Sequence, residues 1–326
     1  MLPVSVVSTD GTANTEASGR VNFFIIGAPK SGTTALAQYL SEHPQIHVCE
    51  PKEPQYFTFD FPGHRGVADW PEYLALFPVK QDVTGIPVTG DASVWYLYSR
   101  AAIPAIRATF PDARLIAILR RPDEMLPSLY AQQRRMGIET AKSFSEAWVL
   151  EPLRRAGKRI PMACRTPEFL YYRTVARYGE QLQRVYQQFP SEQVSVFLYE
   201  ELRQNPRLVY TKTLSFLGLE NDSRQDFPVV NAYADVHSAT IQSLLSWLRQ
   251  KARTTHRRLV NPSSTLRAPF GGVTAFIDRW NRREIKKPAL INEMRQHIID
   301  CYRDDISLLE TLLKRDLVAW TKINQS

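Results

Sequence analysis

A short apolar run that leads through a glycine-rich segment into a helical pattern constrains this chain most. Residues 22–27, NFFIIG, form a continuous apolar run typical of a strand buried on both faces of a parallel sheet. Residues 33–42 carry apolar side chains at helical spacing and end before Pro44. The segment between them, GAPKSGTT at 27–34, therefore joins a strand to a helix. This context favours a phosphate-binding turn over an arbitrary glycine loop.

The loop has the spacing of a phosphate-binding loop but lacks its usual lysine. Gly27 and Gly32 stand as in G-x-x-x-x-G-K-[ST], and Thr34 takes the place of the magnesium-binding hydroxyl. Thr33 occupies the lysine position, and Lys30 lies upstream of it. A glycine turn that opens a helix directs backbone amides and the positive helix end at an anion. Without the usual lysine a triphosphate is poorly held, but Lys30 can still reach a group that leaves from the phosphate.

Other buried-strand patterns alternate with helical patterns along the chain. This alternation predicts an α/β fold, with a mainly parallel sheet of the P-loop type, flanking helices and a helical C-terminal third. The expected strands, after the one at 22–27, are 88–93, 114–119 and 194–199, and the expected helices, after the one at 33–42, are 122–135, 206–218 and 291–313.

Length and composition fit one large domain. The chain has 326 residues, of which 44% are hydrophobic, which is enough for a substantial core. Residues 1–20 are rich in small polar residues and are expected to form a flexible tail, and residues 21–326 a single domain. Residues 137–167 and 230–288 carry less regular patterns and are expected to line or cover a binding cleft.

Charge and cysteine content narrow the ligand class and the compartment. The net charge of +8 favours anionic ligands without choosing among them. Cysteines 49, 164 and 301 form no zinc or disulfide pattern, which fits a reducing compartment. No apolar run approaches the length of a membrane span, and the N-terminus lacks a secretory pattern, so we expect a cytoplasmic protein without a membrane span.

Two clusters of cations stand apart from the loop. Four basic residues fall within 154–159 and five within 249–258. We expect both clusters to be solvated helix faces, although either can attract an anionic acceptor or surface. Neither is interleaved with aromatics as in single-strand nucleic-acid binders, and no nucleic-acid-reading motif is recognised.

The loop and its surroundings resemble those of sulfotransferases that use 3′-phosphoadenosine 5′-phosphosulfate (PAPS) as donor. FFIIGAPKSGTTALAQYLSEHPQI is similar to the 5′-phosphosulfate loop of that family. LRRPDEMLPSLY, at 119–130, resembles its second motif, an arginine at a strand end and a serine eight residues later that hold the 3′-phosphate. ARYGEQLQRVYQQFPSEQVSVFLYEEL, FLGL and LLKRDLVAW are similar to later parts of the carbohydrate-type and bacterial branch. The resemblance runs from about Phe23 to Trp320, with the middle of 230–288 unmatched.

The resemblance implies a set of site residues. Lys30 is expected to stabilise the oxygen that leaves sulfur, and Glu53, in EPQYF, to act as the base on the acceptor. Glu50 is the second choice for the base. Lys52 is expected to be a solvated lysine, although contact with donor or acceptor stays open. The donor is expected to contact Lys30, Ser31, Gly32, Thr33, Thr34, Arg120 and Ser128.

The implied function is transfer of a sulfuryl group from PAPS to a hydroxyl, or as second choice an amine. The acceptor is expected to be a carbohydrate, a glycolipid or a small natural product, and no metal ion is expected to be required. Two alternatives remain: a kinase of the same fold that uses ATP, and a non-catalytic basic protein that binds nucleotides. The resemblance also makes 137–167 and 230–288 candidate acceptor-side segments. The sequence does not set the oligomeric state.

Overall fold

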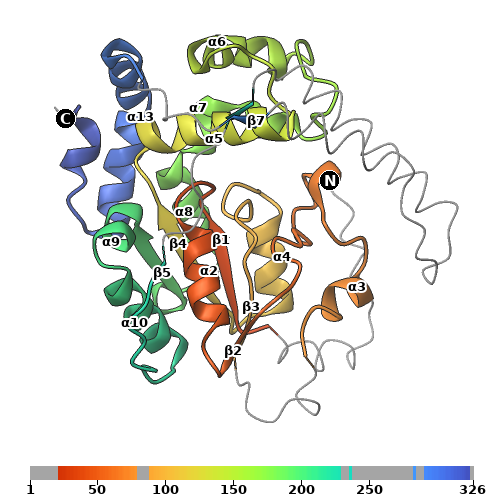
Figure 1. The fold of residues 1–326 in the computed structure, drawn as a ribbon, viewed down its shortest axis with the longest axis vertical. Helices are drawn as coiled ribbons and strands as arrows, with labels where there is room; N and C mark the ends of the chain where they lie inside the picture. Colours follow the sequence, from red (N-terminus) through yellow and green to blue (C-terminus); the bar gives the residue numbers. More distant parts are fainter. Residues whose placement is uncertain (1–20, 79–87, 229–234, 237–281, 284–289, 324–326) are drawn as a thin grey trace, which may run out of the picture. The chain divides into compact units, whose positions relative to one another are not determined.

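The computed structural model describes residues 21–78, 88–228, 235–236, 282–283 and 290–323 (Figure 1). The expected tail at 1–20 and most of 230–288, including the basic cluster at 249–258, lie outside these residues. The described residues group into two compact units. The first draws on residues 21–78, 88–120, 178–228 and 307–315, and the second on residues 121–177, 235–236, 282–283, 290–306 and 316–323.

The first unit is built on a five-stranded parallel sheet. Four of its strands confirm the predicted ones, and a three-residue strand, β2, was not predicted. The sheet has the order β2-β3-β1-β4-β5, so β1 is the central strand, with β3 and β4 beside it (Figure 1). Along the sequence, β2 and β3 are added on one side of β1, and β4 and β5 are then added on the other side. The order of the strands therefore reverses at β1, which makes its carboxyl end a topological switch point. The strands are β1 (Phe23–Gly27), β2 (Ile46–Val48), β3 (Val88–Asp91), β4 (Arg114–Leu119) and β5 (Val194–Leu198).

Both faces of the central strand are buried, which explains its continuous apolar sequence. Phe23 and Ile25 belong to an apolar cluster that includes Leu36 from helix α2 (Thr33–Ser41) and Leu214 from helix α10 (Pro206–Leu217). Phe24 points the other way, because successive side chains of a strand face opposite sides. Its ring packs against those of Phe57, Tyr96 and Phe110.

The four predicted helices are present, and several further ones were not predicted. Two of the predicted helices end at glycines in the left-handed conformation, Gly137 and Gly218, as such C-caps commonly do. The helix that ends at Gly137 is α5 (Pro122–Met136), and the fourth predicted helix is α13 (Asn292–Leu313). The others are α3 (Trp70–Leu74), α4 (Ala102–Thr109), α6 (Phe144–Arg155), α7 (Tyr172–Val175), α8 (Tyr178–Tyr186) and α9 (Tyr199–Gln204). Short 3₁₀ turns lie at Pro62–His64, Pro167–Leu170, Ser191–Gln193 and Val318–Thr321, and β6 (Asp235–Val236) pairs with β7 (Arg282–Arg283).

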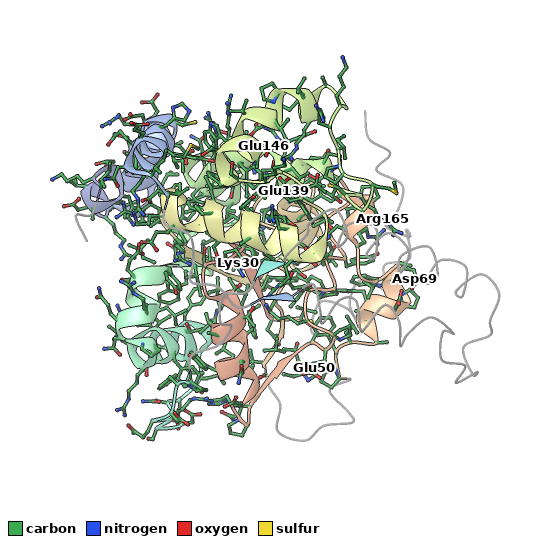
Figure 2. The ribbon with its side chains drawn as sticks, turned by 45° about the horizontal axis from the view of Figure 1, so that its top comes forward. Lys30, Glu50, Asp69, Glu139, Glu146 and Arg165 are labelled. Carbon is green, nitrogen blue, oxygen red and sulfur yellow. The ribbon has the colours of Figure 1, made fainter. Side chains whose placement is uncertain are left out.

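The second unit contains a regular helix where the sequence suggested an irregular segment. Helix α6 fills residues 144–155 of the stretch 137–167. Ser143 begins it by accepting a hydrogen bond from the amide of Glu146, and Glu146 in turn accepts one from the amide of Lys142. Figure 2 shows Glu146 in this part of the chain. This exchange follows the S-x-x-E pattern of a capped helix start.

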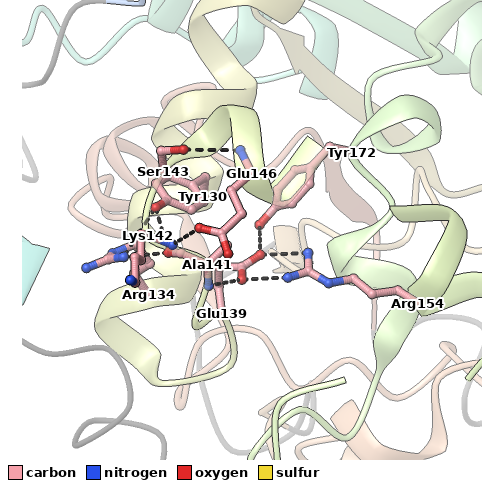
Figure 3. A network of polar contacts seen from close by, with 9 residues as sticks. All are labelled: Tyr130, Arg134, Glu139, Ala141, Lys142, Ser143, Glu146, Arg154 and Tyr172. Carbon is pink, nitrogen blue, oxygen red and sulfur yellow. Dashed lines mark hydrogen bonds and ion pairs between the residues drawn. The ribbon is translucent and has the colours of Figure 1, made fainter. Parts of the chain in front are cut away.

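The expectation that the basic cluster at 154–159 is solvated is wrong for Arg154, which is buried. Its side chain is 1% exposed and donates to both carboxylate oxygens of Glu139, at 2.6 and 2.7 Å. The hydroxyl of Tyr172 and the amide of Ala141 complete the partners of that carboxylate (Figure 3). The helical period places residue 154 on the same inward face as residues 147 and 151, while the other cations of the cluster stay exposed.

Among the described residues, no helix is both long enough and apolar enough to cross a membrane.

Replacing Arg154 by methionine is expected to destabilise the protein strongly. Glu139 would remain buried without its cation, and breaking one side of a buried ion pair costs about 3–5 kcal/mol. Urea denaturation of the two proteins measures the difference. Lys158→Met, an exposed cation of the same cluster, is the matched control and should change the free energy of unfolding by less than about 0.5 kcal/mol. Equal losses for the two variants would contradict the buried pair.

Candidate functional site

The glycine loop joins β1 to α2, as the sequence predicted. β1 ends at Gly27, and α2 begins at Thr33, directly after Gly32. Gly32 is the N-cap residue, and no side chain caps the helix. Because the first amides of a helix have no intrahelical acceptor, the start of α2 offers N–H donors to an anion.

Both glycines of the loop are required by their surroundings. A Cβ at Gly27 would lie 2.8 Å from Cβ of Leu97 and 3.1 Å from the carbonyl of Val94. A Cβ at Gly32 would lie 2.6 Å from Cδ2 of Leu202, and the φ of +89° at Gly32 also disfavours other residues. The glycines therefore let neighbouring segments pack directly against the loop.

Arg120 lies against the loop, although the sequence separates it from Lys30 by 90 residues. It directly follows β4, the neighbour of β1, and its Nη1 donates to the carbonyl oxygen of Lys30 at 3.3 Å. Its guanidinium also lies 4.2 Å from the centre of the Tyr199 ring, a contact that the sequence did not predict. Lys30 itself has a φ of +61°, a left-handed conformation that is uncommon for lysine. The guanidinium of Arg120 is thus held against the backbone of the loop at Lys30.

The three hydroxyl residues of the loop differ in exposure. Ser31 is fully buried, and its Oγ donates to the carbonyl of Pro29 at 3.3 Å. Thr33 is 3% exposed, whereas Thr34 is partly exposed. Thr34 is therefore the loop hydroxyl best placed to meet a ligand.

Ser128 lies in helix α5 and is partly exposed. It belongs to the second compact unit, whereas Arg120 is the last residue of this part of the first. Its pairing with Arg120 at a 3′-phosphate remains a prediction from the motif.

Glu53 is connected to the loop through Lys52. The ammonium of Lys52 donates to Oγ1 of Thr34 at 2.9 Å and lies 3.3 Å from Oε1 of Glu53. The other carboxylate oxygen of Glu53 accepts a hydrogen bond from Nε2 of Gln55 at 3.3 Å. Lys52 is only 25% exposed, so the expectation of a solvated lysine is wrong. Glu50 is exposed and lies apart from Lys30 in Figure 2, which favours Glu53 as the acidic residue of the site.

A buried carboxylate anchors the segment that carries Glu53. Asp91, at the end of β3, is fully buried and accepts hydrogen bonds from the hydroxyls of Ser93, Tyr96 and Tyr73, at 2.6, 2.8 and 3.1 Å. The hydroxyl of Ser93 also accepts a hydrogen bond from the backbone amide of Gln55 at 3.0 Å. This geometry favours a structural role for Asp91.

Burial raises the pKa of Asp91 to about 6, from an ordinary 3.8. The hydrogen bonds from Ser93, Tyr96 and Tyr73 favour the ionised form and oppose this effect, whereas the nearby charge of Glu53 adds to it.

The two histidines that precede Glu53 have partners of their own. Nδ1 of His43 accepts from the amide of Gln45, and a ring nitrogen of His47 lies 2.9 Å from the carbonyl of Leu76. In the described part of the chain, no group of three or more His, Cys, Asp or Glu side chains is arranged to hold a metal ion.

A family model of the sulfotransferase domain matches residues 20–250, which is more than half of the chain. The chain belongs to the sulfotransferase family. The site described above occupies the part of this sulfotransferase that the family model covers, from the loop at 27–34 to Tyr199.

This sulfotransferase is similar both to curated proteins and to proteins of solved structure. Among curated proteins, it is 32% identical over 204 residues to the human bifunctional heparan sulfate N-deacetylase/N-sulfotransferase 3, and 28% identical over 216 residues to the Drosophila melanogaster heparan sulfate N-deacetylase/N-sulfotransferase. These matches cover 60% and 61% of the chain, but only 22% and 20% of those longer proteins. Among solved structures, it is similar to a sulfotransferase from Alicyclobacillus acidocaldarius, with 27% identity and a TM-score of 0.65. That match covers 93% of this chain and 99% of the other.

The raised pKa of Asp91 predicts a pH-dependent stability. Because the folded protein holds this proton up to about pH 6, the stability that protonated Asp91 contributes is fully present below pH 4 and is lost as the pH rises through 6. From pH 4 to pH 7, the free energy of unfolding of the wild type should therefore fall by about 2–3 kcal/mol relative to that of Asp91→Asn. Urea denaturation at several pH values measures both curves. Parallel curves would show that Asp91 titrates as in the unfolded chain.

Proposed function

We propose that this protein transfers the sulfuryl group of PAPS to a hydroxyl or an amine of an acceptor. The observation that carries the proposal is the contact between Arg120 and the backbone of the loop at Lys30, which holds a guanidinium against the loop that leads into the uncapped start of α2. Membership of the sulfotransferase family supports the donor. A donor with phosphates at both ends of its ribose fits two cationic positions better than a single phosphate would.

The loop and Arg120 would bind different phosphates of the donor. The amides from Ser31 to Thr34 and the Thr34 hydroxyl would hold the 5′-phosphate at the helix start. Arg120 would hold the 3′-phosphate with its planar guanidinium, together with the hydroxyl of Ser128. These roles follow the family motifs.

Lys30 and Glu53 would carry the chemical step. The acceptor oxygen or nitrogen forms a bond to sulfur while the bond from sulfur to the bridging oxygen breaks. The electron pair of the broken bond stays on the bridging oxygen, which becomes part of the 5′-phosphate of adenosine 3′,5′-bisphosphate. Lys30 stabilises the charge that develops there, and Glu53 takes the proton of the acceptor.

We propose a carbohydrate as the acceptor. The names of the curated relatives, which refer to N-sulfation of heparan sulfate, support a carbohydrate and make an amine a serious alternative to a hydroxyl. A glycolipid or a small natural product is the next choice. Residues 21–326 would act as one domain, with 137–167 and 230–288 on the acceptor side.

An ATP-dependent kinase is the main alternative. Thr33 at the usual lysine position counts against it, because that lysine holds the β- and γ-phosphates of ATP. Magnesium-dependent turnover of ATP without any response to PAPS would support the kinase.

The 3′-phosphate should dominate nucleotide binding. Calorimetric titration with adenosine 3′,5′-bisphosphate is expected to show binding about 2 kcal/mol tighter than with adenosine 5′-phosphate, as for a hydrogen-bonded charge pair. Arg120→Ala should remove most of this difference and leave the binding of adenosine 5′-phosphate little changed. If the two nucleotides bind the wild type equally, the proposed donor site is wrong.

Glu53→Gln should abolish sulfuryl transfer without weakening the donor. The amide keeps the shape of the side chain but cannot accept the proton, so we expect a loss of 10²-fold or more in kcat, as for a general base. An acceptor screen with ³⁵S-labelled PAPS, using glucosamine-containing oligosaccharides first, provides the assay. Glu50→Gln is the matched control and should keep its activity. The opposite result would move the base to Glu50.

A further inference from the structure

Thr34 has an unusual partner for its position in a phosphate-binding loop. In nucleoside-triphosphate enzymes, the hydroxyl that follows the loop lysine binds the magnesium ion that bridges the phosphates. In this protein, Oγ1 of Thr34 accepts a hydrogen bond from the ammonium of Lys52 at 2.9 Å. A monovalent cation therefore contacts the hydroxyl that, in nucleoside-triphosphate enzymes, binds the divalent one.

The carboxylates of this region do not fit a magnesium ion. Magnesium in such sites is held by the loop hydroxyl and a carboxylate, usually through water. Asp91, at the end of the strand next to β1, directs both oxygens at three hydroxyl donors. Glu53 has a nitrogen donor at each oxygen, from Lys52 and Gln55. An ammonium 2.9 Å from the Thr34 hydroxyl would also repel a divalent cation there.

The surroundings hold the Lys52 ammonium in place. It lies between the Thr34 hydroxyl and the Glu53 carboxylate, and three-quarters of the side chain is buried. The carboxylate is in turn fixed by Gln55, which is 1% exposed and tied through its backbone amide to Ser93. A cation that is already ordered loses less rotamer freedom when an anion arrives.

We propose that Lys52 takes the place of magnesium in this loop and contacts a non-bridging oxygen of the donor's 5′-phosphate. This inference rests on the proposed function. A phosphosulfate carries fewer negative charges than the phosphates of ATP, so Lys30 and Lys52 together suffice without a divalent ion. Lys52 also neutralises Glu53 while the donor is absent, and the donor's anion competes for the same ammonium. Donor binding would therefore loosen the ion pair and leave an oxygen of Glu53 for the acceptor proton.

The test compares two ligands that differ only in the 5′-phosphate: adenosine 3′,5′-bisphosphate and adenosine 3′-phosphate. Both are titrated by calorimetry into the wild type, Lys52→Met, Lys52→Arg and Lys212→Met, each with magnesium and with excess EDTA. Lys212 is an exposed lysine of α10, so its replacement controls for net charge. The binding of adenosine 3′-phosphate controls for folding.

We expect Lys52→Met to weaken the bisphosphate about tenfold, as for the loss of one charged hydrogen bond, and to leave adenosine 3′-phosphate unchanged. Lys52→Arg should recover most of the loss, Lys212→Met should match the wild type, and EDTA should not change wild-type binding.

Two results would overturn the role of Lys52 alone: a wild type that needs magnesium to bind the bisphosphate, or a Lys52→Met protein that binds it as the wild type does. If the wild type gains nothing from the 3′-phosphate, the proposed function falls, and the inference about Lys52 falls with it.

Discussion

The close packing of the loop between β1 and α2 is the constraint on which the site depends. Two backbone hydrogen bonds of 2.8 Å fix its start, from Ala28 to the carbonyl of Ile118 and from Leu97 to that of Ile26. The surroundings of Gly27 and Gly32 leave no room for a side chain at either position, because neighbouring segments pack directly against the backbone there. The loop is thus built from main-chain atoms held by the sheet, and its amides can face an anion without rearranging.

A layer of polar contacts around the buried carboxylate of Asp91 supports the site from strand β3, which lies next to β1. Asp91 collects three hydroxyl groups at the end of β3, and one of these hydroxyls, from Ser93, accepts the amide of Gln55. Through Gln55 and Lys52 this layer reaches Glu53 and then Thr34. The candidate base and the loop therefore belong to one continuous set of polar contacts, although they come from different segments of the chain.

Sequence patterns predicted the sheet and the loop well because these rest on local signals. The apolar runs of β1 and β4 match their strands closely, and the glycines at 137 and 218 mark the ends of two helices. β2 has only three residues, which is too short for a periodic signal. The contact of Lys52 with Thr34 was not predictable, since the two residues stand 18 positions apart in the sequence. Arg154 was misjudged because its partner Glu139 lies outside its helix.

The stacking of Arg120 on Tyr199 orders the arginine side chain before an anion binds to it. The ring and the carbonyl of Lys30 restrict the guanidinium before any ligand is present. The entropy of ordering this long side chain is therefore lost when the chain folds and not when an anion binds. An arginine on a flexible loop would have to lose its side-chain conformational freedom at each binding event. The aromatic ring thus contributes to ligand affinity through the unbound protein, by narrowing the set of conformations from which binding starts.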